Sequence, residues 1–465
     1  MFLLDNRDPR PLHVKLYHQI KNQILSGKLL PHTKLPSVRH LAAELLVSRN
    51  TVEYAYGQLC TEGFIYSKPQ SGYYISLLDQ EFIPPPRRNP ENPNEPALEA
   101  KEIFSFDFHP AGLAPDSFPI KVWRKLLTDC LQENPEQFTL YGNPQGEREL
   151  RYQIQRYLGL FRGVSCNPEQ IVISSGLQDS LSMIAPILYG DHSNLAIEEP
   201  GHWIPRTVFQ NYSFLLNPVS VHSDGIDLDY LKNTDSTVVY VTPSHQFPLG
   251  YVMPVENRLK LLNWAKTVGG VIMEDDYDSE LRYHGKPIPA LQGLHPEGNI
   301  IYLGSFSKVL SPALRVAYMV LPYRFLNAYS KMFGNFTPTV SLLEQRTLSQ
   351  FMAQGYWERH LRKMRIIYKR KHDVLIQSIK RYFGTEANIL GQGAGLHVVL
   401  EFTGNLIDET ELIQRAWREN VRVIPLADTY QAKNHYPARV MLGFGRMSPD
   451  ELEQGIERLS RAWRF

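Results

Sequence analysis

A chain of 465 residues is too long for one compact domain and predicts roughly two to four of them. Its hydrophobic content of 43%, charged content of 21% and net charge of +1 are ordinary for a soluble globular protein and exclude a polycation. The three cysteines have no paired spacing, which argues against a disulfide framework or a zinc site.

The chain carries no visible membrane or export signal. No apolar run approaches the length that crosses a bilayer, and the N-terminus lacks the basic start and apolar stretch of a signal peptide. The cysteine usage fits a reducing compartment. We therefore expect a cytoplasmic protein with no membrane partner and no bound metal.

The first 78 residues carry an excess of basic side chains, with nine Lys and Arg against five Asp and Glu. Apolar periodicity predicts three helices there, and Pro11, Ser37 and Ser48 stand where they begin. Two short strands, at 64–66 and 72–75, follow the helices. This order describes a winged helix-turn-helix, an α+β DNA-binding domain, although a small helical interaction domain with a basic face would share the periodicity.

The geometry of a winged helix-turn-helix selects candidate DNA contacts. The start of the third helix reaches the floor of the major groove, where hydroxyls bind phosphates and an arginine binds a guanine edge. The preceding helix holds the DNA backbone, and the wing reaches the adjacent minor groove. The candidate side chains are Ser37, Arg39, Ser48, Arg49, Thr51 and Lys68.

Residues 11–76 also resemble the winged-helix domain of GntR-type regulators. The resemblance lies in the runs Leu35-Pro36-Ser37-Val38-Arg39 and Val47-Ser48-Arg49-Asn50-Thr51-Val52 and in the pair Glu62-Gly63. It implies binding to double-stranded promoter DNA.

A proline-rich stretch divides the chain. Six prolines fall between residues 84 and 96, with Asn, Glu and Arg between them, and such a segment holds neither a helix nor a central strand. We predict a winged-helix domain at 1–78, an extended linker at 79–102 and an effector domain at 103–465.

Beyond residue 103, continuous apolar strands alternate with helices, and polar residues follow the strands. This pattern predicts an α/β domain with a mostly parallel sheet that binds ligands at the carboxyl ends of its strands. One strand, 171–173, leads through small residues into a helix start, where backbone amides and the helix dipole suit a phosphate. The candidate residues are Ser175, Gly176 and Leu177.

Lys308 follows the apolar strand 300–303, with Ser305 and Ser307 before it and Arg315 seven residues after it. This set suits a phosphate-bearing aldehyde, because the amine forms a Schiff base while the hydroxyls and the guanidinium bind phosphate oxygens. Taken alone, the segment is also compatible with a surface lysine after a strand.

An acidic run at 274–280 follows the apolar strand 271–273. A carboxylate that faces a pyridine nitrogen keeps the nitrogen protonated, and Asp275 is the candidate for this role. Tyr277 is the candidate to bind the ring hydroxyl. A Mg²⁺ site or a solvated acidic loop would be the alternatives for such a cluster.

The order of these elements resembles fold-type I aminotransferases over residues 103–465. The resemblance implies pyridoxal 5'-phosphate on Lys308, with His245 beside the cofactor. His202 or Trp203 is the candidate to stack on the pyridine ring, and a role in packing alone is the alternative for either side chain. The run from Tyr141 to Gly146 resembles the segment that hands a tyrosine to the phosphate site of the partner subunit, so Tyr141 is expected to complete the second site of a domain-swapped homodimer.

A GntR-type winged helix joined to an aminotransferase-like domain resembles the MocR/GabR-type transcriptional regulators. The resemblance implies promoter binding controlled by a small effector, either an amino compound or a B6 vitamer. Ile204, Asp428 and Met441 stand where arginines for an effector carboxylate are expected, which argues against GABA. The alternative is a working aminotransferase that carries a DNA-binding domain.

Overall fold

The computed structural model describes residues 10–78, 104–133, 135–283, 288–402, 408–431 and 437–463. The chain divides into two compact units, residues 1–101 and 102–465. The predicted linker at 79–102 lies outside the described residues.

The small unit is the predicted winged helix. Its three helices pack around one core that includes Leu16, Ile20, Tyr56 and Leu59, all fully buried. The two strands pair antiparallel and form the wing. The elements are α1 (Leu12–Leu25), α2 (Val38–Glu44), α3 (Arg49–Thr61), β1 (Ile65–Lys68) and β2 (Gly72–Ile75).

The helix starts of the small unit follow from their capping residues. The Ser37 hydroxyl accepts a hydrogen bond from the His40 amide at 3.2 Å and begins α2. The Ser48 hydroxyl accepts from the Thr51 amide at 3.2 Å and begins α3. Both side chains therefore satisfy amides that a helix start leaves without an intrahelical partner.

The large unit is built on an eight-stranded sheet with the order β4-β11-β10-β9-β8-β5-β6-β7. The neighbouring pairs from β10 to β6 are parallel, whereas β11 runs antiparallel to both β10 and β4. The mostly parallel sheet confirms the predicted fold class. Its strands are β4 (Ile171–Ser174), β5 (Asn194–Glu199), β6 (Leu215–His222), β7 (Gly225–Ile226), β8 (Val238–Val241), β9 (Val271–Asp276), β10 (Ile300–Ser305) and β11 (Ala317–Val320).

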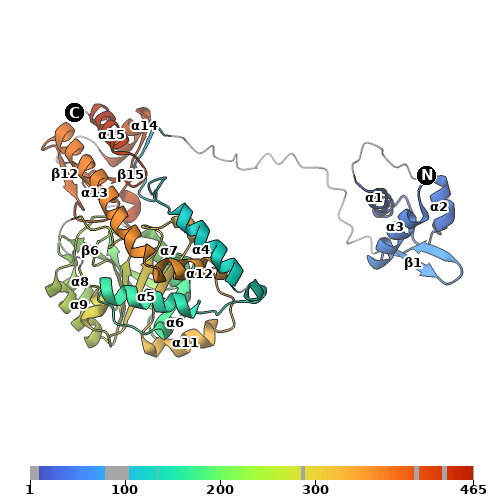
Figure 1. The fold of residues 1–465 in the computed structure, drawn as a ribbon, viewed down its shortest axis with the longest axis horizontal. Coiled ribbons are helices and arrows are strands. Elements are labelled where there is room, and N and C mark those ends of the chain that lie inside the picture. The colour runs from blue at the N-terminus through green and yellow to red at the C-terminus, as the bar shows by residue number, and fades with distance from the viewer. Residues whose placement is uncertain are drawn as a thin grey trace. The chain divides into compact units, whose positions relative to one another are not determined.

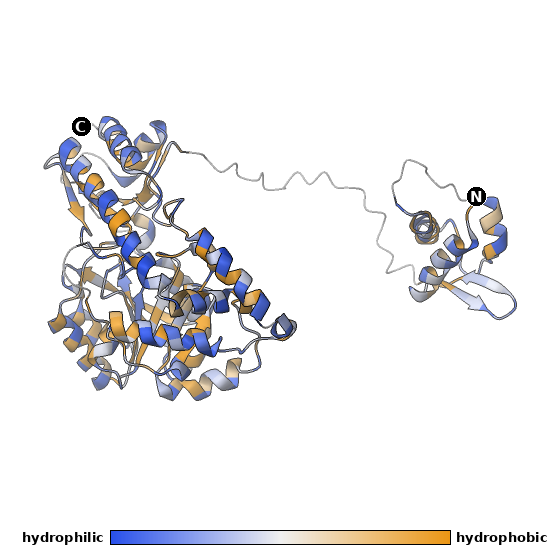
Figure 2. Ribbon diagram, in the orientation of Figure 1, coloured by the Kyte–Doolittle hydropathy of each residue, from blue (hydrophilic) through white to orange (hydrophobic). Residues whose placement is uncertain are grey.

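Helices cover both faces of this sheet, as the apolar strand sequences require. Successive side chains of a strand point to opposite faces, so Val172 joins a different core cluster from Ile171 and Ile173. Figure 2 shows the large unit's helices with blue and orange residues interspersed, which is the pattern of helices packed on one side. The covering helices are α4 (Ile120–Glu133), α5 (Arg148–Phe161), α6 (Leu177–Leu188), α7 (Trp203–Asn211), α8 (Leu228–Lys232), α9 (Val255–Thr267), α10 (Leu291–Leu294), α11 (Tyr323–Phe333) and α12 (Leu342–Ala353).

A second, antiparallel sheet forms the C-terminal part of the large unit, with the order β12-β13-β16-β15. The long helix α13 (Tyr356–Phe383) runs from α12 to this part in Figure 1. A short parallel pair joins β3 (Phe106–Asp107) to β14 (Val421–Arg422). The remaining elements are β12 (Ala387–Leu390), β13 (His397–Phe402), α14 (Glu409–Arg418), β15 (Ile424–Pro425), β16 (Arg439–Gly443) and α15 (Pro449–Ala462).

Candidate functional site

A cavity of about 300 Å³ lies where β9 and β10 end and α6 begins. It gathers side chains from segments that lie far apart in the sequence. Ligands of parallel sheets bind at this edge, because the loops that follow the strands converge there. The lining includes Gly176, Leu177, His202, Asp275, Tyr277, Ser305, Ser307, Lys308, Arg315 and His397.

Lys308 lies at this cavity, three residues after the end of β10. Its Nζ donates a hydrogen bond to the Pro110 carbonyl at 3.3 Å. Burial lowers the pKa of the Lys308 amine, and the Asp278 and Asp275 carboxylates partly offset this effect. A lowered pKa leaves more of the amine neutral, and the neutral amine is the form that attacks an aldehyde.

A cradle for an anion forms beside the lysine. Gly176 caps α6 with a φ of 128°, and a Cβ at this position would collide with the Arg315 guanidinium. Arg315 therefore lies directly against the amino end of a twelve-residue helix. The Ser305 hydroxyl accepts from the Ser307 amide at 3.1 Å, so both serines belong to the same turn. Amides, hydroxyls and a guanidinium at one helix start suit a phosphate.

Ser175 differs from its neighbours in this cradle. It does not line the cavity, and its amide donates to the Asp179 carboxylate at 2.8 Å. The Ser180 hydroxyl does line the cavity and pairs with the Ser174 hydroxyl at 2.6 Å. The sequence pattern missed Ser180 because it lies one turn inside the helix.

Asp275 also lines the cavity, from β9. The Tyr240 hydroxyl donates a hydrogen bond to its carboxylate. Burial raises the pKa of Asp275 to about 7, whereas the Tyr240 hydrogen bond and the nearby Lys308 charge lower it. A buried carboxyl of this kind is suited to share a proton with a ring nitrogen.

His245 does not line the cavity but lies behind Tyr277. Its Nδ1 is 3.0 Å from both carboxylate oxygens of Asp278 and 3.0 Å from the Tyr277 hydroxyl. The resemblance predicted His245 beside the cofactor, and the structure places its ring within hydrogen-bond distance of Tyr277. Tyr277 itself lines the cavity.

Two other histidines do line the cavity. The His202 Nδ1 accepts from the Ile204 amide at 3.1 Å, and burial lowers the pKa of His202 to about 3. The His397 Nε2 bonds the Pro248 carbonyl at 2.9 Å, and burial lowers the pKa of His397 to about 3. Both rings are therefore neutral near pH 7 and suited to packing against a flat ligand. His397 follows a glycine-rich turn far from the other motifs, and no pattern in the sequence singled it out.

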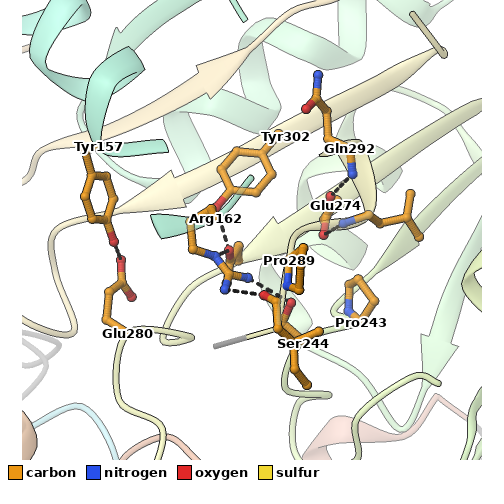
Figure 3. Close-up of polar contacts among 12 residues, drawn as sticks. Tyr157, Arg162, Pro243, Ser244, Glu274, Glu280, Pro289, Gln292 and Tyr302 are labelled. Atoms are coloured by element: carbon orange, nitrogen blue, oxygen red, sulfur yellow. Dashed lines mark hydrogen bonds and ion pairs between the residues drawn. The ribbon is translucent and has the colours of Figure 1, made fainter. Parts of the chain in front are cut away.

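Three other carboxylates of the acidic run, Glu274, Asp276 and Glu280, do not line the cavity and take part in buried polar contacts, of which Figure 3 shows those of Glu274 and Glu280. The Arg162 Nε donates to Asp276 at 2.6 Å, and the Tyr302 hydroxyl donates to the same carboxylate oxygen at 2.5 Å. The Glu274 carboxylate accepts from two α10 amides, and the Tyr157 hydroxyl donates to Glu280 at 2.6 Å. These carboxylates are buried and bound to protein groups, so the run is not a solvated loop. In the part of the chain that the structure describes, no three His, Cys, Asp or Glu side chains form a metal-binding group.

The three positions at which arginines for an effector carboxylate are expected carry Ile204, Asp428 and Met441. Ile204 lines the cavity, Met441 is buried in an apolar cluster, and Asp428 lines a neighbouring cavity. Tyr141 does not line the cavity of its own chain, and its side chain is 88% exposed.

The candidate DNA contacts lie on the surface of the small unit. Ser37, Arg39, Ser48 and Arg49 are exposed, and Thr51 is half-buried next to the Ser48 cap. The Lys68 Nζ lies 4.8 Å from the centre of the Tyr74 ring. Asn50 and Tyr54 are exposed on α3 and were not among the predicted contacts. Within the described residues, no helix combines the length and apolar character needed to span a bilayer.

Comparisons with known proteins agree with this geometry. Residues 12–75 match the gntR family of bacterial regulatory proteins, and residues 111–459 match the aminotransferases of class I and II. The uncharacterized HTH-type transcriptional regulator YhdI of Bacillus subtilis is 36% identical, over 99% of this chain and 97% of the relative. The probable rhizopine catabolism regulatory protein MocR of Rhizobium meliloti is 32% identical, over 100% of this chain and 96% of the relative.

A solved structure supports the nature of the cofactor. LysN, the α-aminoadipate aminotransferase of Thermus thermophilus in complex with N-(5'-phosphopyridoxyl)-L-leucine, is 27% identical. It superposes with a TM-score of 0.68 and covers 78% of this chain and 92% of its own. The cavity residues fit such a group, because an amine, a buried carboxyl and an anion cradle surround one space. The chain therefore belongs to the MocR-type transcriptional regulators, in which a DNA-binding winged helix of the GntR family is joined to an aminotransferase-like domain that binds pyridoxal phosphate.

Proposed function

We propose that the large unit is a sensor, in which ligand exchange at the cofactor changes the affinity of the winged helix for promoter DNA. The observation that carries the proposal is the convergence of Lys308, Asp275 and Arg315 on one cavity in a chain that also has a DNA-binding unit. Pyridoxal phosphate supplies an aldehyde that binds amines reversibly. The effector is an amino compound or a B6 vitamer.

The cavity geometry supports a role for each side chain toward the cofactor. Lys308 would bind the aldehyde carbon, and Asp275 would hold the ring nitrogen. Tyr277, oriented by His245, would bind the ring hydroxyl, while His202 packs on the ring. The phosphate would be held by Gly176, Leu177, Ser305, Ser307 and Arg315, through amides, hydroxyls and the guanidinium.

We also propose that the regulator acts in the cytoplasm as a homodimer with shared sites. The Tyr141 side chain is largely exposed on its own chain, as a residue donated to a partner would be. Two winged helices in such a dimer would bind two DNA half-sites. Arg39, Arg49 and Lys68 would contact the DNA, together with the hydroxyls of Ser37, Ser48 and Thr51.

Promoter-binding measurements test the sensor function. Footprinting upstream of the regulator's own gene and its neighbours would locate the operator. Fluorescence anisotropy on that operator, at one fixed salt concentration, then compares the wild type with Lys308→Ala, each with and without pyridoxal phosphate. We expect the cofactor to change the operator affinity of the wild type and not that of the variant. Equal responses of the two proteins would refute the sensor function.

A working aminotransferase is the second candidate, and one observation favours it. The buried amine of Lys308 and the buried carboxyl of Asp275 line the same cavity, as proton transfer during transamination requires. Steady-state assays across a panel of amino donors and keto acids discriminate between the candidates. Turnover of several per second would show that the protein is an enzyme. A reaction that stops after a single turnover would favour the sensor function.

A further inference from the structure

A second cavity, of about 590 Å³, opens beside the cofactor cavity. Phe247 lines both cavities, so they share a wall. Pro110 lines the second cavity, and its carbonyl accepts the hydrogen bond from the Lys308 Nζ at 3.3 Å. The second cavity therefore begins at the Pro110 carbonyl, to which the Lys308 amine is hydrogen-bonded. A ligand that approaches this amine has room for its remaining atoms there.

The walls of the second cavity are mostly aromatic and aliphatic. Trp203 comes from the start of α7, Trp417 from the end of α14, and Met441 from β16. The two tryptophan residues are about half exposed, at 46% and 49%. Large apolar rings at the mouth of a cavity mark a binding surface, because burying them under a ligand is favourable.

Two arginines lie two residues along the sequence from expected carboxylate positions, Arg206 from Ile204 and Arg439 from Met441, and both have protein partners. The Arg439 guanidinium forms an ion pair with Glu401 at 2.5 Å and a hydrogen bond to the Tyr430 hydroxyl at 3.0 Å. The Arg206 guanidinium donates to the carbonyls of Thr429 and Tyr430 at 3.0 and 3.3 Å. Withdrawing either group to bind a ligand carboxylate would break these contacts and leave a partly buried carboxylate or carbonyl unsatisfied.

Two charged side chains remain on the lining, Arg422 and Asp428. The Arg422 Nη1 lies 3.9 Å from the Asp107 carboxylate, which is too long for a hydrogen bond. Asp107 also faces Arg446 at 3.7 Å. Arg422 is thus the lining guanidinium to which the carboxylate of a ligand would bind. Asp428 instead favours a ligand without a negative charge.

We propose that the second cavity holds the apolar body of the effector, an amine with an aromatic or large aliphatic group and no carboxylate. The amino group meets the Pro110 carbonyl beside Lys308, and the body packs between Trp203, Trp417 and Met441. This inference rests on the proposed sensor function, because it names the class of ligand that the sensor binds.

Calorimetric titration of the full-length, cofactor-loaded protein tests the ligand class. The probes are 2-phenylethylamine, ethylamine, L-phenylalanine and GABA. We expect 2-phenylethylamine to bind at least about tenfold more tightly than ethylamine, because its ring is buried against the indoles. We expect it to exceed L-phenylalanine by a similar factor, because the carboxylate would be repelled by Asp428 and would compete with Asp107 for Arg422. Equal affinities for all four probes would overturn the proposal.

Variants locate the binding in the second cavity. Trp417→Ala is expected to reduce the preference for 2-phenylethylamine over ethylamine to less than about threefold. Tyr230→Ala, which removes an exposed ring on α8 outside both cavities, is expected to leave the preference unchanged. Met441→Arg is expected to reverse the preference between 2-phenylethylamine and L-phenylalanine. An unchanged preference in Trp417→Ala would overturn the proposal.

Arg422→Ala tests the competing ligand chemistry. One contrary outcome is that L-phenylalanine binds the wild type more tightly than 2-phenylethylamine does, with the difference abolished in the variant. In that outcome Arg422 binds the ligand carboxylate, and the proposal is wrong. The sensor function is judged by separate observations, since it fails if the protein shows no cofactor absorbance or if bound amines leave operator affinity unchanged. Calorimetry can therefore refute the ligand class while the sensor function stands.

Discussion

The surroundings of the Asp275 carboxyl oppose its charge. Burial raises its pKa from an ordinary value near 3.8 to about 7. Between these two pH values the unfolded chain releases a proton that the folded chain retains. The stability that this group contributes is therefore complete below pH 3.8 and is lost as the pH rises toward 7. A bound ring with a protonated nitrogen would offset the penalty.

Asp275→Asn removes this titration. Without cofactor at pH 8, we expect the variant to be more stable than the wild type by on the order of 2–4 kcal/mol. The difference should disappear near pH 4. Urea unfolding, monitored by circular dichroism at both pH values, measures this difference in the free energy of unfolding.

Glu280→Gln serves as the matched control for Asp275→Asn. Burial also raises the pKa of Glu280 to about 7, but Glu280 does not line the cavity. Both variants should gain stability at pH 8. Added pyridoxal phosphate should then stabilise the wild type and Glu280→Gln, but stabilise Asp275→Asn much less. Equal cofactor effects in all three proteins would contradict the role of Asp275.

Gly176 gives a second prediction at the residue scale. In Gly176→Ala the new Cβ would push the Arg315 guanidinium away from the start of α6, and the φ of 128° would be strained. We expect the affinity for pyridoxal phosphate, measured by absorbance titration, to fall at least about tenfold, which corresponds to roughly 1.4 kcal/mol. Gly190→Ala carries similar backbone strain with no atom near its Cβ, and it should retain the wild-type affinity.

At the scale of elements, the buried polar contacts of Arg162 hold the carboxyl end of β9 in place. Arg162 is buried, and it is the basic partner of the buried Asp276. Arg162→Met would leave that carboxylate uncompensated, and we expect a loss of about 3–5 kcal/mol in the free energy of unfolding. Arg415→Met, which breaks an ion pair with Glu411 one turn away on α14, should cost about 0.5 kcal/mol or less. Denaturant unfolding of both variants compares these values.

The start of α3 separates a structural role from a DNA-binding role. Ser48→Ala removes the cap of α3 and is expected to destabilise the winged helix by about 1 kcal/mol. Arg49→Ala leaves the cap intact and is expected to weaken operator binding, with a smaller dependence of affinity on salt if Arg49 binds a phosphate. Thermal unfolding and anisotropy at several salt concentrations measure the two effects. Unchanged operator affinity in Arg49→Ala would refute the assignment.

The elements also show how far the sequence could predict the site. Lys308 and Asp275 were visible because each lies at or just beyond the carboxyl end of a continuous apolar strand, where a parallel sheet places its ligands. Arg162 was not visible, because it follows α5 more than a hundred residues before its partner and no local pattern marks it. His397 and the second cavity depend on the packing of the second sheet and α14, which periodicity alone cannot arrange.

At the scale of the whole molecule, the proposed homodimer with shared sites predicts complementation between defective subunits. A mixed dimer of Lys308→Ala and Tyr141→Ala would contain one site with an intact lysine and an intact partner tyrosine. Random mixing should then restore about a quarter of the wild-type sites, whereas each variant alone restores none. Cofactor absorbance after co-refolding measures the fraction. No recovery in the mixture would argue that each subunit completes its own site.

The antiparallel strand β11 has a consequence for how this site can change. Since β11 begins at the edge where β4 and β10 end, the turn between β10 and β11 carries both the amine and the guanidinium. The Phe306 amide donates to the Val316 carbonyl at 3.1 Å and closes this turn, so the two ends of the turn are held together. Loops elsewhere on the sheet can lengthen and acquire new ligands. An insertion into this one would change the separation of Lys308 from Arg315 and with it the fit to the cofactor.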